Sequence, residues 1–304
     1  MEASVSLKKI GKTINEKSVL AGLSFGIEKG SIMSIIGPND SGKSLLLKMI
    51  SGGCKPEFGS IYIDGKDIQL RKKEISSEIG YMPQYIDFDY NLTILENLQF
   101  HGRIYGMNSK QIVERIIFLS EKIELNHILN QFPGDLSYGF KRKAMFLRSL
   151  LHDPSILLLD EPTLSLDLKS QYRFWKLINE LKGDKTIIYT TQSIKESENI
   201  YERIIFLSGG KIVLDGNYDQ LINKTADFHK FVITFEILDD KLYNKLLSIS
   251  SVIDPKKNLN KFEFYGKTKK TLFDVLRKVI KENLLDCEIS KVGLDTLYLN
   301  STKE

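Results

Sequence analysis

The segment Gly-Pro-Asn-Asp-Ser-Gly-Lys-Ser at residues 37–44 constrains the fold of this 304-residue chain more than any other feature. It fits the pattern G-x-x-x-x-G-K-[S/T]. The β-branched apolar run at residues 31–36 precedes it, and a helical pattern at residues 44–50 follows it and stops at Gly52 and Gly53. Glycines in such a strand–loop–helix unit let successive backbone N–H groups point at phosphate oxygens, and the helix dipole favours the negative charge. The motif therefore predicts a phosphate-binding loop.

This loop indicates that the chain binds ATP with Mg²⁺ and hydrolyses the nucleotide. Lys43 is expected to reach the β- and γ-phosphates, and the hydroxyl of Ser44 to ligate the metal. The residues expected to contact the nucleotide here are Gly37, Pro38, Asn39, Asp40, Ser41, Gly42, Lys43 and Ser44.

The composition is that of an ordinary globular protein. Lys and Arg number 43 against 39 Asp and Glu, and this small excess gives no reason to expect a nucleic-acid partner. Cys54 and Cys287 form no CxxC pair, so a reducing cytosol fits better than a disulfide framework or a zinc site. The N-terminus has no signal-peptide core, and no apolar run approaches the roughly 18 residues that a membrane span needs. We expect a cytoplasmic protein that works at a membrane only through a partner.

Short apolar strands alternate with helical patterns in the first part of the chain. Strands are expected at residues 60–63, 79–82, 156–159, 186–190, 204–207 and 211–214, with hairpin signals at Asp64-Gly65 and Gly209-Gly210. This alternation predicts an α/β domain with a largely parallel sheet over residues 1–224. Residues 225–304 differ, with strands expected at 230–238, at 261–265 and near Cys287, and helices at 241–248 and 271–283. They predict a small C-terminal α+β domain.

A second motif, Ile-Leu-Leu-Leu-Asp-Glu-Pro at residues 156–162, delivers two carboxylates at the end of a buried strand. Ligands of open parallel sheets bind at the carboxyl ends of the strands. Asp160 is expected to hold magnesium through water, and Glu161 to act as the general base that polarises the attacking water.

The order of the motifs carries a resemblance to a known family. The phosphate loop, Gln84 after a strand, Leu-Ser-Tyr-Gly-Phe at residues 136–140 and Leu-Leu-Leu-Asp-Glu-Pro together resemble the ATP-binding cassette (ABC) ATPases over about residues 3–220. The resemblance implies a P-loop NTPase core with an antiparallel β subdomain and a helical subdomain. It also implies a head-to-tail homodimer, or a pair with another ATPase subunit. Ser137 and Gly139 would then contact the γ-phosphate bound by the opposite subunit.

The same resemblance assigns further residues. Gln84 is similar to the loop glutamine that senses magnesium and the membrane partner, so the implied metal ligands are Ser44, Gln84 and Asp160. Asp167 resembles the loop residue that crosses the dimer interface. Gln192 occupies a position that is histidine in most relatives; an amide can donate a hydrogen bond to the γ-phosphate but cannot carry a proton. Catalysis would therefore depend on Glu161 and lack a histidine titration near neutral pH.

Three departures from the family pattern affect the nucleotide. Ile10 is expected where relatives carry the aromatic residue that stacks on adenine, so base stacking would be weaker and nucleotide selectivity looser. Asp40 adds a carboxylate within the phosphate loop, which should lower affinity unless it points to solvent or a partner. Tyr138 and Phe140 replace a glycine and a glutamine of the signature.

Finer features resemble the daunorubicin-resistance and polysaccharide-type exporter ATPases. These features are Gln192, the short signature, the C-terminal domain and the segments at residues 92–107 and 292–299. Residues 92–107 would form part of the surface that docks a transmembrane permease subunit. Such a chain would lie peripherally on the inner face of the cell membrane. The alternatives are a soluble ABC ATPase without a transport role and an ATP-binding regulatory subunit with low turnover. Lysines around residues 261–265 favour a solvated face over a lipid or nucleic-acid patch.

Overall fold

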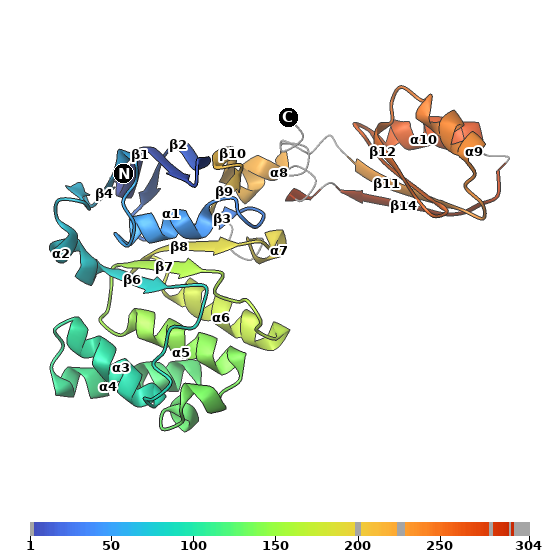
Figure 1. The fold of residues 1–304 in the computed structure, drawn as a ribbon. Helices are drawn as coiled ribbons and strands as arrows, with labels where there is room; N and C mark the ends of the chain where they lie inside the picture. Colours follow the sequence, from blue (N-terminus) through green and yellow to red (C-terminus); the bar gives the residue numbers. More distant parts are fainter. Residues whose placement is uncertain (1–2, 198–201, 224–228, 280–281, 292, 295–304) are drawn as a thin grey trace. The chain divides into compact units, whose positions relative to one another are not determined.

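The computed structural model of the protein describes residues 3–197, 202–223, 229–279, 282–291 and 293–294 (Figure 1). The chain divides into two compact units, Met1–Asp215 and Gly216–Glu304. The domain boundary expected between residues 224 and 225 lies outside the described residues, as does most of the segment 292–299. Among the described residues, no helix is both long enough and apolar enough to span a membrane.

A six-stranded sheet forms the centre of the first unit, with strand order β10-β9-β3-β8-β7-β6. Strand β3 pairs in parallel with β8 and β9, and β7 pairs in parallel with β6 and β8. Strands β3, β7 and β8 are buried along their whole length, as expected for strands covered on both faces. Their bounds are β3 Ile32–Ile36, β6 Ile79–Met82, β7 Ile156–Asp160, β8 Thr186–Thr191, β9 Arg203–Ser208 and β10 Lys211–Asn217. The predicted parallel α/β core is confirmed.

An antiparallel sheet with the order β2-β1-β4-β5 lies in the same unit. Its strands are β1 Ala3–Ile14, β2 Lys17–Glu28, β4 Phe58–Ile63 and β5 Lys66–Asp67. Buried residues of this sheet join those of helix α1, Lys43–Ile50, in one hydrophobic cluster that also reaches β3 and β7. The phosphate loop connects β3 to α1, and buried residues of both elements belong to this cluster, so the cluster holds the two ends of the loop in place.

A second hydrophobic cluster holds the helical part of the unit. It joins α3 Ile94–Ile104, α4 Ser109–Ile123, α5 Tyr138–Leu150 and α6 Leu168–Glu180 to the other side of the central sheet (Figure 1). Capping boxes at Thr93 and Asn108 fix the starts of α3 and α4 by satisfying the free N–H groups of the first turn. Shorter elements are α2 Lys72–Ile75, α7 Ile194–Ser197 and the 3-10 turns Ser76–Glu78, Asn126–Ile128 and Pro133–Asp135.

The second unit contains helix α8, Tyr218–Asn223, and an antiparallel sheet with the order β12-β13-β11-β14. Its strands are β11 His229–Phe235, β12 Ile253–Asn258, β13 Lys261–Gly266 and β14 Leu284–Lys291, and its other helices are α9 Asp240–Leu247 and α10 Lys269–Val279. Phe231, Ile233 and Phe235 point from β11 into a core shared with both of these helices. The first expected strand ends at Phe235 rather than at residue 238. Strand β12 was not expected, and its Pro255 and lysines suit an edge position.

Candidate functional site

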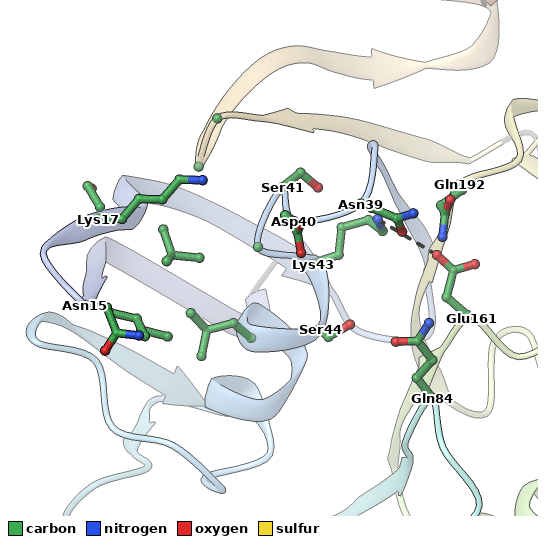
Figure 2. A pocket seen from close by; sticks show the side chains of 17 residues that line it. Asn15, Lys17, Asn39, Asp40, Ser41, Lys43, Ser44, Gln84, Glu161 and Gln192 are labelled. Carbon is green, nitrogen blue, oxygen red and sulfur yellow. Dashed lines mark ion pairs between the residues drawn. The ribbon is translucent and has the colours of Figure 1, made fainter.

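A cavity of about 600 Å³ opens over the phosphate loop of the first unit (Figure 2). The loop follows β3, and Glu161 follows β7, so the carboxyl ends of parallel strands supply the site. The lining residues are Ile14, Asn15, Lys17, Ser18, Val19, Asn39, Asp40, Ser41, Gly42, Lys43, Ser44, Leu45, Gln84, Glu161, Gln192, Gly209 and Gly210. Side chains predicted from four separate motifs are thus brought together in one cavity.

The phosphate loop has the backbone that its glycines predict. Gly42, which precedes α1, has a φ of 99°, and a Cβ placed there would come within 2.6 Å of Leu20 Cδ2. Asp40 also has a positive φ, 61°, and its exposed side chain lines the cavity. The first N–H groups of α1 have no partner within the helix, so they can bind an anion at this end.

Lys43 is the cation of the site. Its side chain is only 6% exposed, and its Nζ donates hydrogen bonds to the carbonyls of Gly37 at 2.8 Å and Pro38 at 2.9 Å. The same Nζ lies 3.9 Å from Oε1 of Glu161 (Figure 2). Burial lowers the pKa of Lys43, and the carboxylates of Glu161, Asp160 and Asp40 oppose that shift. The Asp40 carboxylate therefore acts electrostatically on Lys43.

Ser44 and Asp160 form the second group of polar atoms. The Ser44 hydroxyl donates to Oδ1 of Asp160 at 3.1 Å, and the Thr190 hydroxyl donates to the same oxygen at 2.6 Å. Asp160 is 2% exposed. The Gln84 amide points toward Ser44 (Figure 2). Hydroxyl, carboxylate and amide oxygens are hard donors of the kind that Mg²⁺ prefers, so the predicted ligand set fits that ion.

Glu161 lies directly beyond Asp160 in a strained backbone conformation. Its φ is 49°, a region that residues other than glycine rarely adopt, and its N–H is held by the carbonyl and the hydroxyl of Thr190. Burial raises the pKa of Glu161 and the charge of Glu196 raises it further, whereas Lys43 and hydrogen bonding with Gln192 act in the other direction. A carboxylate with a raised pKa is a stronger base, which suits proton abstraction from water.

Six of the predicted contact residues do not line this cavity: Gly37, Pro38, Ser137, Gly139, Asp160 and Asp167. The first two and Asp160 are hydrogen-bonded to Lys43 and Ser44, which do line it, whereas the other three lie elsewhere in the first unit. Ser137 is exposed at the start of α5, where its Oγ accepts a hydrogen bond from the N–H of Phe140 at 3.4 Å. Gly139 follows in the first turn of α5. Asp167 is exposed at the start of α6, and its carboxylate accepts from the backbone and hydroxyl of Ser170 at 2.9 and 2.7 Å. Ser137, Gly139 and Asp167 therefore lie outside the cavity over the phosphate loop.

The expectation for Ile10 is wrong. Ile10 is fully buried in the hydrophobic cluster beneath the loop, whereas Ile14 is 44% exposed and lines the cavity. The register of β1 against β2 shifts between Leu7 and Ile10, and Lys9 has a φ of 52°. This bulge carries Ile10 to the core. Ile14 directly precedes Asn15, a residue type that favours turns, and this was the signal in the sequence that could have identified it.

Family comparison places the cavity in a known context. The family model described as "ABC transporter" matches residues 20–164, which contain the phosphate loop, Gln84, Ser137 and Glu161. A second model, described as an uncharacterized protein conserved in archaea, matches residues 157–246.

Known relatives and solved structures agree with the first match. Proteins called "Nod factor export ATP-binding protein I" from Rhizobium sp. (strain N33) and Paraburkholderia xenovorans (strain LB400) are 33% and 32% identical, each over 73% of this chain and over 74% and 73% of their own length. The structure of an ATP-binding subunit of an ABC transporter has a TM-score of 0.67 and 25% identity over 73% of this chain and 93% of its own. A dimeric ATP-binding cassette bound to ADP and Pi in a post-hydrolysis state has a TM-score of 0.65 and 28% identity, over 70% of this chain and 98% of its own.

Proposed function

We propose a function for this chain from one premise, that it belongs to the ATP-binding cassette (ABC) transporter family as an ATP-binding, ATP-hydrolysing subunit. The proposal is that it powers an exporter whose membrane-spanning part is a separate chain. The convergence of Lys43, Gln84, Glu161 and Gln192 on one cavity above the phosphate loop is the observation that carries it. The relatives named as export ATP-binding proteins support the export direction.

In the proposed hydrolysis, the residues in and beside the cavity have separate roles. Lys43 would exchange its carbonyl partners for the β- and γ-phosphates, and the N–H groups at the start of α1 would bind the remaining oxygens. Glu161 would accept the proton of the attacking water, and the Gln192 amide would donate to the γ-phosphate. Ser44, Gln84 and Asp160 would hold Mg²⁺, which neutralises charge on the phosphate oxygens.

A second subunit is proposed to complete the site. Ser137 and Gly139 lie at an exposed helix start outside the cavity, where they are available to a nucleotide bound by another chain. Helix α6 follows its N-cap, Asp167, and exposes Leu168 by 85% and Tyr172 by 74%. Such large exposed apolar side chains favour a contact surface. We infer a head-to-tail homodimer that closes on ATP and opens after hydrolysis.

The membrane partner is proposed to dock on the segment at residues 92–107. On α3, Phe100 is 61% exposed and Ile104 is 64% exposed, and their spacing of four places them on one helix face. Tyr85, beside Gln84, is 73% exposed. A partner that covers these side chains would sense the state of the site through Gln84, and it would hold the chain on the inner face of the membrane.

The hydrolytic part of the proposal is tested with Glu161→Gln. This variant should bind ATP and form a dimer that persists with ATP, while phosphate release falls by about 100-fold or more because the base is absent. Size-exclusion chromatography with light scattering measures the dimer, and a phosphate assay measures turnover. Unchanged phosphate release would exclude Glu161 as the base.

Purification from native membranes without ATP tests the transport part. A multi-spanning membrane protein should be recovered with the wild-type chain and lost with Phe100→Glu combined with Ile104→Glu. Leu70→Glu is the matched control, because Leu70 is 82% exposed in the same unit but lies outside α3. Recovery with ribosomes alone would favour a soluble ABC ATPase, and very slow turnover without any partner would favour a regulatory subunit.

A further inference from the structure

Arg142 is a charged side chain in the interior of the first unit. It lies in α5, five positions after Ser137, and it is 0% exposed. Burial of a guanidinium is costly unless hydrogen bonds replace its water. Burial lowers the pKa of Arg142, and the nearby carboxylates of Asp160 and Glu161 are among the groups that oppose this shift. An arginine remains charged under these conditions, so its partners must compensate for the lost hydration.

Those partners are main-chain carbonyls from two different strand ends. The Nη1 atom donates to the carbonyls of Pro83 and Gln84, both at 2.8 Å. The Nη2 atom donates to the carbonyl of Asp160 at 3.0 Å and to that of Glu161 at 2.6 Å. Each pair of carbonyls directly follows, or ends, one of the neighbouring parallel strands β6 and β7. One guanidinium therefore joins two of the segments that carry polar side chains of the cavity, those of Gln84 and Glu161.

The rigidity of the guanidinium makes this connection specific. Its donors lie in one plane at fixed separations, so it can hold two acceptor pairs only at a fixed spacing. Two other side chains of α5 also bond to the segment after β6: the Tyr138 hydroxyl donates to the Gln84 carbonyl at 3.4 Å, and Arg148 donates to Asp87 at 2.5 Å. Only Arg142 among these three also reaches the carbonyls at the end of β7.

We propose that Arg142 is a positioning residue for ATP hydrolysis. It fixes the backbone of Gln84 relative to the backbone of Asp160 and Glu161, and it fastens both to the helix that Ser137 begins. The inference rests on the proposed roles of Gln84 and Glu161 in the site. Arg142 does not line the cavity and touches no nucleotide, so its loss should change the rate of the chemical step more than the affinity for ATP.

The test compares Arg142→Met, which keeps the length but removes every donor, with Arg142→Lys, which keeps the charge and one donor group. In Arg142→Met, kcat should fall by about 100-fold while the KM for ATP stays within about threefold, because small displacements of catalytic groups are costly. Arg142→Lys should recover part of kcat, since an ammonium can bond to some of the carbonyls but cannot span both pairs. Arg115→Gln is the control for loss of an arginine, because its ion pair with Asp153 lies in the helical part.

All rates are measured at a temperature at which the fluorescence of the single tryptophan, Trp175, shows each variant to be folded. A folded Arg142→Met with wild-type kcat overturns the proposal. An equal loss of kcat in Arg142→Met and Arg142→Lys also overturns it. If Arg142→Met does not fold, Arg142→Lys decides, with a reduced kcat at constant KM expected and a wild-type kcat contrary to it. Glu161→Gln is assayed beside them: if it retains turnover, the proposed role of Glu161 fails, whereas the kcat effects at position 142 are read independently.

Discussion

The hydroxyl of Ser44 lies 3.1 Å from Oδ1 of Asp160, and it brings the first turn of α1 against the end of β7. The two residues are 116 positions apart in the chain. Thr190, at 2.6 Å, holds the same carboxylate oxygen from β8. Two of the three proposed magnesium ligands, Ser44 and Asp160, are therefore bonded to each other, and Thr190 holds the carboxylate from a third segment.

Substitutions in this group should raise the magnesium requirement of hydrolysis. Ser44→Ala removes a proposed ligand and Thr190→Val removes the bond that orients Asp160, so half-maximal activity should need at least about tenfold more Mg²⁺. Titration of Mg²⁺ at fixed ATP measures the effect. Ser51→Ala, at the other end of α1, removes a hydroxyl outside the cavity and should leave the requirement unchanged. An equal shift in all three variants would argue against the assigned ligands.

An aromatic residue at position 14 of the cavity should strengthen the binding of ATP. Ile14→Tyr places a ring at the exposed position that Ile14 occupies, and base stacking contributes about 1 kcal/mol or more, so the Kd for ATP should fall about fivefold. Calorimetric titration of both proteins measures it. Ile10→Val serves as the control, since it alters the buried core and should lower stability by about 1 kcal/mol without changing the Kd. A lower Kd for ATP in Ile10→Val and not in Ile14→Tyr would indicate that Ile10, and not Ile14, contacts the nucleotide.

Gln192 should leave hydrolysis without a histidine titration near neutral pH. The variant Gln192→His should acquire a new inflection in kcat close to pH 6.5, roughly the ordinary pKa of a histidine, because protonation adds a charge that faces the γ-phosphate. The pH dependence of phosphate release compares the two proteins. Identical profiles would mean that the side chain at this position does not approach the phosphate during turnover.

His152 should make the first unit less stable in mild acid. Its ring stacks on Tyr105 with centroids 3.7 Å apart, and burial lowers its pKa to about 4. The unfolded chain, with an ordinary pKa near 6.5, therefore binds a proton that the folded state does not. The contribution of His152 to the free energy of unfolding is fully present above pH 6.5 and is lost as the pH falls toward 4. At pH 5 the free energy of unfolding should be lower by about 2 kcal/mol. Denaturation followed by Trp175 fluorescence measures the loss.

His152→Gln should reduce this pH dependence, because the amide does not titrate but can still donate to the Ile79 carbonyl that the ring contacts at 3.1 Å. His127→Gln removes an exposed histidine of the same unit and should preserve the wild-type dependence. Identical pH profiles for the wild type and both variants would show that burial of His152 does not contribute.

Much of the fold was predictable from the local sequence pattern, wherever the apolar residues of a segment match the faces that the structure buries. β3, β7 and β8 are apolar runs because both faces are covered, and α1 begins where the glycine loop requires it. The long strands β1 and β2 were not predicted, because register shifts interrupt their alternation, and four residues of β1 and six of β2 are exposed. β12 was missed for a related reason: Pro255 and the lysines of an edge strand look like a loop in sequence.

The site was predictable where the chemistry is local to a motif. The phosphate loop and the Asp160-Glu161 pair were identified from their own neighbours. Ile10 was matched to the family pattern instead, and that match could not show the bulge at Lys9 that turns Ile10 into the core. Arg142 stands in a basic run that resembles a solvated helix face. Its spacing of three from Met145 and four from Phe146, both buried, was the sign that it points inward.

The contacts of Arg142 also determine how this part of the protein can change over generations. Every acceptor is a main-chain carbonyl, and every amino acid supplies one, so substitutions at residues 83, 84, 160 or 161 leave the acceptors in place. All four donors, in contrast, belong to the side chain of one residue, Arg142, and are therefore encoded by a single codon. Variation that loosens or tightens this connection must arise at position 142 or among the side chains that pack around it. Genetic suppressors of a defective allele at that codon should therefore map to the core of α5 and not to the motifs that contact the nucleotide.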